Sequence, residues 1–125
     1  MQTPVKKVLI IDDDNRNIFA LTAVLRSRGY HCLSTGNVSD AVELLKNNNG
    51  IGIILMDMMM PDMDGYEAIP RIKNSEAGYK IPIIAVTAQA MVGDKERCLA
   101  AGADGYVAKP VDVDALMALL HQYVG

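Results

Sequence analysis

The residues best suited to chemistry in this chain stand at the ends of short, mostly apolar segments. Segments 8–11, 51–56, 82–86 and 104–108 lead into Asp12 and Asp13, Asp57, Thr87, and Lys109, in that order. Continuous apolar runs of this length are typical of strands that are covered on both faces of a parallel sheet. Because the carboxyl ends of parallel strands share one edge of the sheet, we expect these five side chains to lie close together.

Such a set of side chains is suited to a metal ion and to phosphoryl transfer. Carboxylates within about 4 Å of one another repel by several kcal/mol at an effective dielectric constant near 20, so a cation is needed among them. Oxygen ligands favour a hard metal, and we expect Mg²⁺, or Mn²⁺ in its place. With the negative charge offset, Asp57 is predicted to attack phosphorus as a nucleophile, while Lys109 and the Thr87 hydroxyl hold phosphoryl oxygens.

The elements that must position these residues alternate between strand and helix. Strands are predicted over 8–11, 32–35, 51–57, 82–86 and 104–108, and a helix follows each of them. Five such alternations without a long linker predict one domain over residues 1–125. Its expected fold class is α/β, with a doubly wound parallel sheet of five strands flanked by five helices.

Several residues mark where the helices should begin and end. Asp14, Asn37 and Asp112 are expected to cap helix starts, and the spacing of Asp64 and Glu67 is that of a capping box. Pro70 lies within the helix that follows this box. Because an interior proline costs roughly 3 kcal/mol in a regular helix, we expect a kink or a late helix start there.

Composition and charge exclude several functional classes. A net charge of −3 with dispersed Lys and Arg argues against nucleic-acid binding. Cys32 and Cys98 are too few for a disulfide framework, and the sequence contains no Cys/His cluster for zinc. The first apolar run is too short for a signal peptide or a membrane helix. We therefore expect a cytoplasmic chain with no membrane contact of its own.

Four segments, in this order, resemble the receiver domain of two-component response regulators. They are Leu9-Ile10-Ile11-Asp12-Asp13-Asp14, Met56-Asp57-Met58-Met59-Met60-Pro61-Asp62-Met63-Asp64-Gly65, Ile83-Ile84-Ala85-Val86-Thr87-Ala88 and 101–110. The resemblance covers essentially the whole chain and implies a flavodoxin-like fold of the receiver type. It also implies that Asp57 accepts a phosphoryl group from a phosphohistidine, carried by a sensor histidine kinase or a histidine phosphotransfer domain.

The resemblance assigns a role to each residue at the strand ends. Asp13, Asp57 and the Met59 carbonyl would ligate Mg²⁺, and Asp12 would hold a metal-bound water. Lys109 would pair with the phosphoryl group, and its bond to Pro110 would be cis. The chain would thus catalyse its own phosphorylation and slow autodephosphorylation without being a conventional turnover enzyme.

A switch is also implied by the resemblance. Thr87 would move toward the phosphoryl oxygens and Tyr106 would turn inward, which would shift the population of states at the fourth helix, fifth strand and fifth helix. The same surface allows a homodimer. The residues at Asn17 and in the tract 65–68 resemble those of receivers that are attached to hybrid sensor kinases. Met59 and Gln89 lie where the family tunes water attack, and the bulk of Met59 predicts a long-lived phosphoprotein.

Two alternative functions are weighed against the receiver interpretation. Asp12 and Asp14 form an Asp-x-Asp after a first strand, as in phosphohydrolases that use an aspartyl phosphate, but Arg16 replaces the Thr or Val expected there and the chain has no cap domain. The other alternative is a docking module that never accepts phosphate. The complete acidic set together with Lys109 argues against it.

Overall fold

The computed structural model describes residues 7–47, 50–60, 65–76, 78–87, 93–109 and 111–124. Strands and helices alternate along these residues, as the sequence predicted. The elements are β1 (Lys7–Ile11), α1 (Asn15–Ser27), β2 (His31–Thr35), α2 (Val38–Lys46), β3 (Ile51–Asp57), α3 (Gly65–Lys73), β4 (Ile83–Thr87), α4 (Asp94–Ala101), β5 (Gly105–Ala108) and α5 (Val113–Val124).

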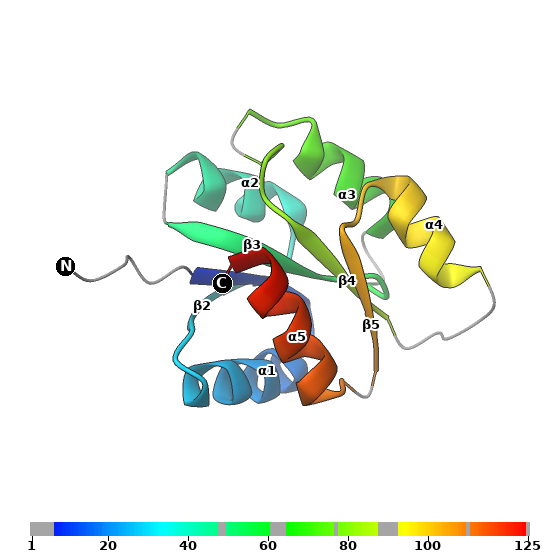
Figure 1. Cartoon of the computed structure of the whole chain (residues 1–125). Coiled ribbons are helices and arrows are strands. Elements are labelled where there is room, and N and C mark those ends of the chain that lie inside the picture. Colours follow the sequence, from blue (N-terminus) through cyan, green and yellow to red (C-terminus); the bar gives the residue numbers. More distant parts are fainter. Residues whose placement is uncertain are drawn as a thin grey trace.

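All five strands belong to one parallel sheet in the order β2-β1-β3-β4-β5. Helices α1 and α5 cover one face of this sheet, and α2, α3 and α4 cover the other (Figure 1). The chain therefore winds in both directions from its first strand, and the predicted doubly wound α/β fold is confirmed. This topology places the carboxyl ends of β1, β3, β4 and β5 on one edge, where the chemistry-bearing residues were expected.

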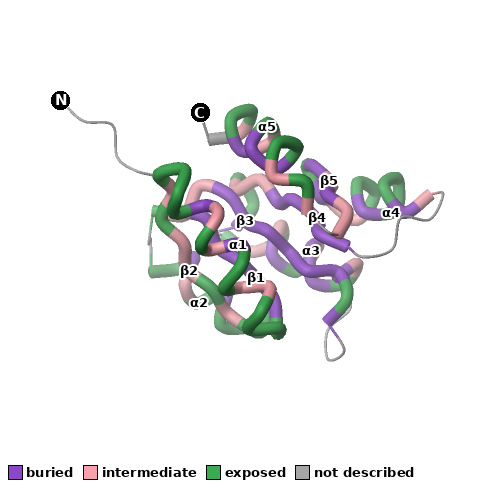
Figure 2. The backbone as a smooth tube through the Cα atoms, turned by 90° about the horizontal axis from the view of Figure 1, so that it is seen from below, coloured by how far each residue is buried: buried purple, intermediate pink, exposed green. Residues whose placement is uncertain are grey.

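The core consists of two apolar layers separated by the sheet. Along β1, Leu9 and Ile11 join the layer under α2, α3 and α4, while Val8 and Ile10 join the layer under α1 and α5. Figure 2 shows the central strands as the most continuously buried part of the chain. Each fully buried Leu or Ile contributes roughly 1.5–3 kcal/mol relative to an exposed one, so this alternation holds the strand ends in fixed register.

The predicted helix caps are present at three helices. The side chains of Asp14 and Asn37 accept hydrogen bonds from the backbone N–H groups of Arg16 and Asp40 at the starts of α1 and α2. The Asp112 carboxylate accepts the Asp114 N–H at 3.0 Å, at the start of α5. Asp64 lies outside the described residues. These caps satisfy backbone donors that a helix start leaves unpaired.

Helix α3 contains Pro70, for which a kink or a late helix start was predicted. The helix begins at Gly65 and continues through Pro70 to Lys73, so the late start is wrong and the kink stays a prediction. Beyond the proline the ladder resumes, since the Asn74 N–H donates to the Pro70 carbonyl at 2.8 Å. Burial of Ala68 and Ile69 against the sheet offsets the cost of the missing proline donor.

Asp104 joins four elements at the edge of the sheet opposite the candidate site. Its Oδ2 accepts the Ile83 N–H at 2.9 Å and the Lys73 Nζ at 2.8 Å. Its carbonyl accepts the Tyr123 hydroxyl at 2.8 Å. One residue thus ties α3, β4, β5 and α5 together away from the chemistry. The helices of the described residues include none that is both long and apolar enough to cross a bilayer.

Candidate functional site

Asp57 is the last residue of β3 and is 5% exposed. Its Oδ1 accepts two hydrogen bonds, one from the Met59 backbone N–H at 3.0 Å and one from the Lys109 Nζ at 3.3 Å. The sequence explains why Asp57 lies at the buried end of the strand, because the residues of β3 that precede it are apolar and pack in the core. A buried carboxylate that is held by a cation and a backbone amide has a defined orientation at the strand end.

Thr87 and Lys109 come from the two strands beyond β3. Thr87 ends β4 in register with Ala108, and the Lys109 N–H donates to the Thr87 carbonyl at 2.7 Å. This backbone bond extends the β4–β5 ladder by one step and brings Lys109 alongside Thr87. Thr87 is 3% exposed. The structure therefore has a buried hydroxyl-bearing residue on the strand beside β3, and the Lys109 ammonium contacts Asp57 itself.

Asp12 and Asp13 follow β1, which is the neighbour of β3 on its other side. Asp12 is 2% exposed, and its Oδ1 accepts the Asp14 N–H at 2.9 Å. Asp13 is exposed. Each of Asp12, Asp13 and Asp57 offers a carboxylate oxygen, and these three oxygens lie within 4.8 Å of one another. The structure therefore brings together the three carboxylates that the sequence singled out.

The electrostatics of this group disfavour a bare cluster. The pKa of Asp12 is raised above its ordinary value, first by burial and then by the negative charge and hydrogen bond of Asp57. The Asp14 amide and the Lys109 charge lower it, but they offset these effects only in part. A divalent cation would relieve the repulsion. An all-oxygen donor set at this spacing fits Mg²⁺, so the residues present are suited to the metal.

Met59 and Tyr106 occupy the margins of the site. The Met59 side chain is 45% exposed, and its backbone N–H contacts Asp57. Tyr106 lies on β5 and is half-buried against the layer under α4. Its pKa is raised, mainly by burial and further by Asp94 and Cys98 of α4. Gln89 and Pro110 lie outside the described residues, so the expectations for them stay predictions.

An apolar pocket of about 250 Å³ opens beside Lys109. Ala20 and Val24 of α1 line one side of it, and Val111 and Val113 line the other. The Lys109 side chain contributes to the wall, so the pocket adjoins the candidate site. An apolar recess next to a charged site is suited to an apolar side chain of a protein partner.

The sequence assigned no structural role to three residues at the contact between α3 and α4, namely Tyr66, Asp94 and Arg97. Asp94 begins α4 and is 6% exposed, and the guanidinium carbon of Arg97 lies 4.3 Å from the centre of the Tyr66 ring. These contacts depend on how α3 packs against α4. No linear spacing or motif signals such packing, because the two helices are separated by a strand.

The chain is similar to known proteins over nearly its whole length. The model of the family described as "Response regulator receiver domain" matches residues 8–121. The sensor histidine kinase RcsC of Salmonella typhi is 40% identical over 116 residues, which are 93% of this chain and 12% of RcsC. The polar-differentiation response regulator DivK of Brucella anthropi is 32% identical over 120 residues, which are 96% of this chain and 97% of DivK.

Solved structures show the same likeness. The receiver domain of the sensor histidine kinase PA1611 from Pseudomonas aeruginosa, which holds a magnesium ion in its active site cleft, is 36% identical with a TM-score of 0.85, covering 98% of this chain and 99% of that one. The receiver domain of Ssk1 of Saccharomyces cerevisiae, solved with the histidine phosphotransfer protein Ypd1, is 28% identical with a TM-score of 0.81, covering 98% and 91%. Together with the family match, the fold and the grouped strand-end residues, this establishes that the chain belongs to the response regulator receiver domain family.

Proposed function

We propose that this chain is a phosphoacceptor switch of a two-component or phosphorelay system, with Asp57 as the acceptor. The observation that carries the proposal is the Lys109–Asp57 pair at 3.3 Å beside a cluster of three carboxylates. An ion pair by itself at a strand end would indicate only a contact that stabilises the fold, and not a site for phosphoryl transfer. A cation, a nucleophile and two further carboxylates at one edge form the parts that phosphoryl transfer needs.

In the proposed reaction, a carboxylate oxygen of Asp57 attacks the phosphorus of a phosphohistidine. A P–O bond to Asp57 forms while the P–N bond to the donor imidazole breaks, and the imidazole leaves with the bonding electron pair and takes up a proton. Lys109 and the Thr87 hydroxyl stabilise the charge on the transferring oxygens. The positioning by β3, β4 and β5 supplies orientation, which is a large part of the catalysis of phosphoryl transfer.

Mg²⁺ is the proposed cofactor, and Mn²⁺ is expected to replace it. Asp13, Asp57 and the Met59 carbonyl would hold the ion directly, and Asp12 would hold one of its waters. When bound, the metal supplies positive charge that neutralises both the carboxylates and the incoming phosphoryl group. The spacing of the three carboxylates supports this assignment, because the buried Asp12 lies close to Asp57 and the repulsion between them favours a bound cation.

The proposed switch uses Thr87 and Tyr106. A phosphoryl group on Asp57 adds roughly −1.5 to −2 units of charge, which attracts the Thr87 hydroxyl. Movement of Thr87 leaves space at the end of β4 into which the half-buried Tyr106 can turn. The response is a population shift at α4, β5 and α5, which present the signal to another protein.

The proposed donor is a helical phosphohistidine domain of a sensor histidine kinase or a histidine phosphotransfer protein. Two features support it: the apolar pocket beside Lys109, and the likeness to Ssk1, whose receiver was solved with such a protein. An apolar side chain of the donor helix would enter between Ala20 and Val113. The donor histidine would then face Asp57 across the carboxylate cluster.

We also propose that the chain acts in the cytoplasm, either as the receiver of a hybrid sensor kinase or as a stand-alone regulator. The 40% identity to the sensor histidine kinase RcsC, of which this chain spans 12%, supports the kinase setting. Cys32 and Cys98 are free thiols, which is consistent with a reducing compartment.

The test uses two phosphoryl donors that share the P–N bond but differ in size. Phosphoramidate and histidine-phosphorylated Ypd1 are each incubated with the chain and Mg²⁺, and transfer is followed by ³¹P NMR. Wild-type protein is expected to accept phosphoryl groups, and Asp57→Asn is expected to accept none. Ala20→Arg should slow transfer from Ypd1 about ten-fold or more while leaving phosphoramidate unaffected. Equal transfer to Asp57→Asn would overturn the acceptor assignment, and equal slowing with both donors would overturn the docking role.

A further inference from the structure

The start of α3 lies directly against the residue that follows Asp57. A Cβ at Gly65 would overlap the flexible end of the Met58 side chain and would lie 3.0 Å from the Met58 Cα, so the lack of a side chain at Gly65 allows this close approach. Met58 itself is 6% exposed, and its N–H is held by the Val86 carbonyl at 2.9 Å. Any displacement of the backbone after Asp57 is therefore passed to the first turn of α3, where Tyr66 stands.

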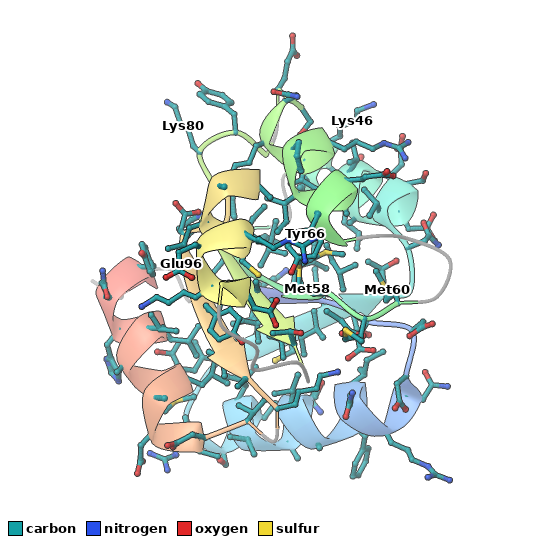
Figure 3. The ribbon with its side chains drawn as sticks, turned by 90° about the vertical axis from the view of Figure 1, so that its right-hand side faces the viewer. Lys46, Met58, Met60, Tyr66, Lys80 and Glu96 are labelled. Atoms are coloured by element: carbon teal, nitrogen blue, oxygen red, sulfur yellow. The ribbon has the colours of Figure 1, made fainter. Side chains whose placement is uncertain are left out.

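Tyr66 connects this first turn to α4. Figure 3 shows its side chain between the ribbons of α3 and α4, close to Met58. The Arg97 guanidinium carbon lies 4.3 Å from the centre of the Tyr66 ring. Tyr66 also hydrogen-bonds the buried Cys98 thiol; burial raises the pKa of the phenol most, and the charge and hydrogen bond of Cys98 raise it further. One ring thus contacts both the exposed and the buried side of α4.

A second tyrosine reaches α4 from the other side. Tyr106 of β5 and Tyr66 of α3 both lie within electrostatic reach of Asp94 and Cys98. Asp94 is 6% exposed, so its environment is set by these neighbours more than by solvent. Two tyrosines therefore lie near the start of α4, one on β5 and the other in the first turn of α3 beside the backbone after Asp57.

We infer that Tyr66 couples the backbone after Asp57 to α4, by a route separate from Thr87 and Tyr106. The inference rests on the proposed function, because it supposes that Asp57 receives a phosphoryl group. Tyr66 acts through α3 as a positioning residue and touches none of the reacting atoms. A shift at Met58 moves Gly65, and the Tyr66 ring carries this movement to Arg97 and Cys98. Helix α4 then responds both to Tyr66 and to the Thr87–Tyr106 pair.

Beryllofluoride with Mg²⁺ is the probe, because it mimics a phosphoryl group on an aspartate. The readout is the change in ¹⁵N amide chemical shifts of α4 on saturation, together with the dissociation constant. In Tyr66→Leu the shift response of α4 is expected to fall by about half or more, with saturation still reached. Arg97→Met should reduce the response in the same way, and the double variant should reduce it no further than Tyr66→Leu alone.

Two controls separate coupling from loss of structure. Tyr79→Leu removes an exposed tyrosine that also stacks on a cation, with the Lys80 Nζ 5.4 Å from its ring centre, and should leave the α4 response unchanged. Arg97 is exposed, so Arg97→Met leaves the core intact. This variant therefore tests the coupling even if Tyr66→Leu does not fold. The coupling would be overturned by a full α4 response in Arg97→Met. It would also be overturned if Tyr66→Leu folds and loses stability but keeps the full α4 response, because Tyr66 would then have a structural role only. Wild-type protein that binds no beryllofluoride would overturn the proposed function and this inference with it.

Discussion

The Lys109 Nζ and the Met59 backbone N–H converge on the same oxygen of Asp57, at 3.3 Å and 3.0 Å. This oxygen therefore lies between a side-chain ammonium and a backbone donor. Two neighbouring strand ends supply the remaining groups, Asp12 from β1 and Thr87 from β4. The arrangement explains why a carboxylate is tolerated at an almost fully buried strand end.

Removing the Lys109 charge should slow phosphorylation without unfolding the protein. Lys109→Met keeps the apolar stem and removes the ammonium that stabilises the transferring oxygens. The initial rate of phosphorylation by acetyl phosphate is expected to fall roughly 10²- to 10³-fold, as for the loss of one preorganised donor. Lys80→Met is the matched control, because that lysine lies far from the site and pairs with Tyr79. A Lys109→Met rate near that of the wild type would contradict the assigned role.

Asp12→Asn should stabilise the metal-free protein at neutral pH. Because the folded pKa of Asp12 lies above its ordinary value of 3.8, folding favours the protonated form. The stability associated with this carboxyl is present below about pH 4 and is lost as the pH rises through the raised pKa. The stability difference between Asp12→Asn and wild type should therefore grow over that range and then level off once Asp12 is ionised in both the folded and the unfolded state.

Urea unfolding in a chelator between pH 4 and 8 measures this difference. Asp14→Asn is the control, since asparagine caps a helix as well as aspartate and Asp14 is exposed. Mg²⁺ at ten times its dissociation constant should stabilise the wild type by about 1.4 kcal/mol. An Asp12→Asn protein that is less stable than wild type in the chelator at pH 7 would show that the cluster carries no electrostatic strain.

Met59→Asn should shorten the lifetime of the phosphoprotein. In the proposed phosphoprotein the apolar Met59 side chain, which is exposed, would exclude water from the acyl phosphate, whereas asparagine would orient a water by hydrogen bonding. The rate of autodephosphorylation, followed by release of inorganic phosphate, is expected to rise about ten-fold. Met59→Leu keeps the apolar bulk and should leave the rate unchanged. Similar rates in all three proteins would mean that Met59 does not shield the phosphoryl group.

Asp104→Asn should destabilise the fold and leave the chemistry intact. The substitution weakens a carboxylate that is bonded to Ile83 and Lys73, and the free energy of unfolding is expected to fall by roughly 1–3 kcal/mol. Glu43→Gln breaks the exposed 3.8 Å pair with Lys46 and should cost less than about 0.5 kcal/mol. Denaturant unfolding compares the two. A phosphorylation rate that changes with Asp104→Asn in folded protein would mean that the two edges of the sheet are coupled.

The sequence predicted the fold and the grouping of strand-end residues because both depend on local signals. Apolar runs identify strands, and parallel topology places residues such as Asp57 and Lys109 on one edge. The late start of α3 that Pro70 suggested is wrong, since the burial of Ile69 that outweighs the proline depends on tertiary packing. The contact between Tyr66 and Arg97 was not foreseen for the same reason. Long-range packing between two helices leaves no periodic pattern in either of them.

The most direct test of the central claim is the intact mass of the chain after incubation with acetyl phosphate and Mg²⁺. The account predicts a single phosphoryl adduct that requires the metal, disappears with a chelator and is absent from Asp57→Asn. A chelator-resistant adduct would contradict the role of the carboxylate cluster. An adduct that persists in Asp57→Asn would contradict the acceptor itself and would direct attention to Asp12. If the wild type shows neither an adduct nor released inorganic phosphate, the chain is a docking module and not a phosphorylated switch.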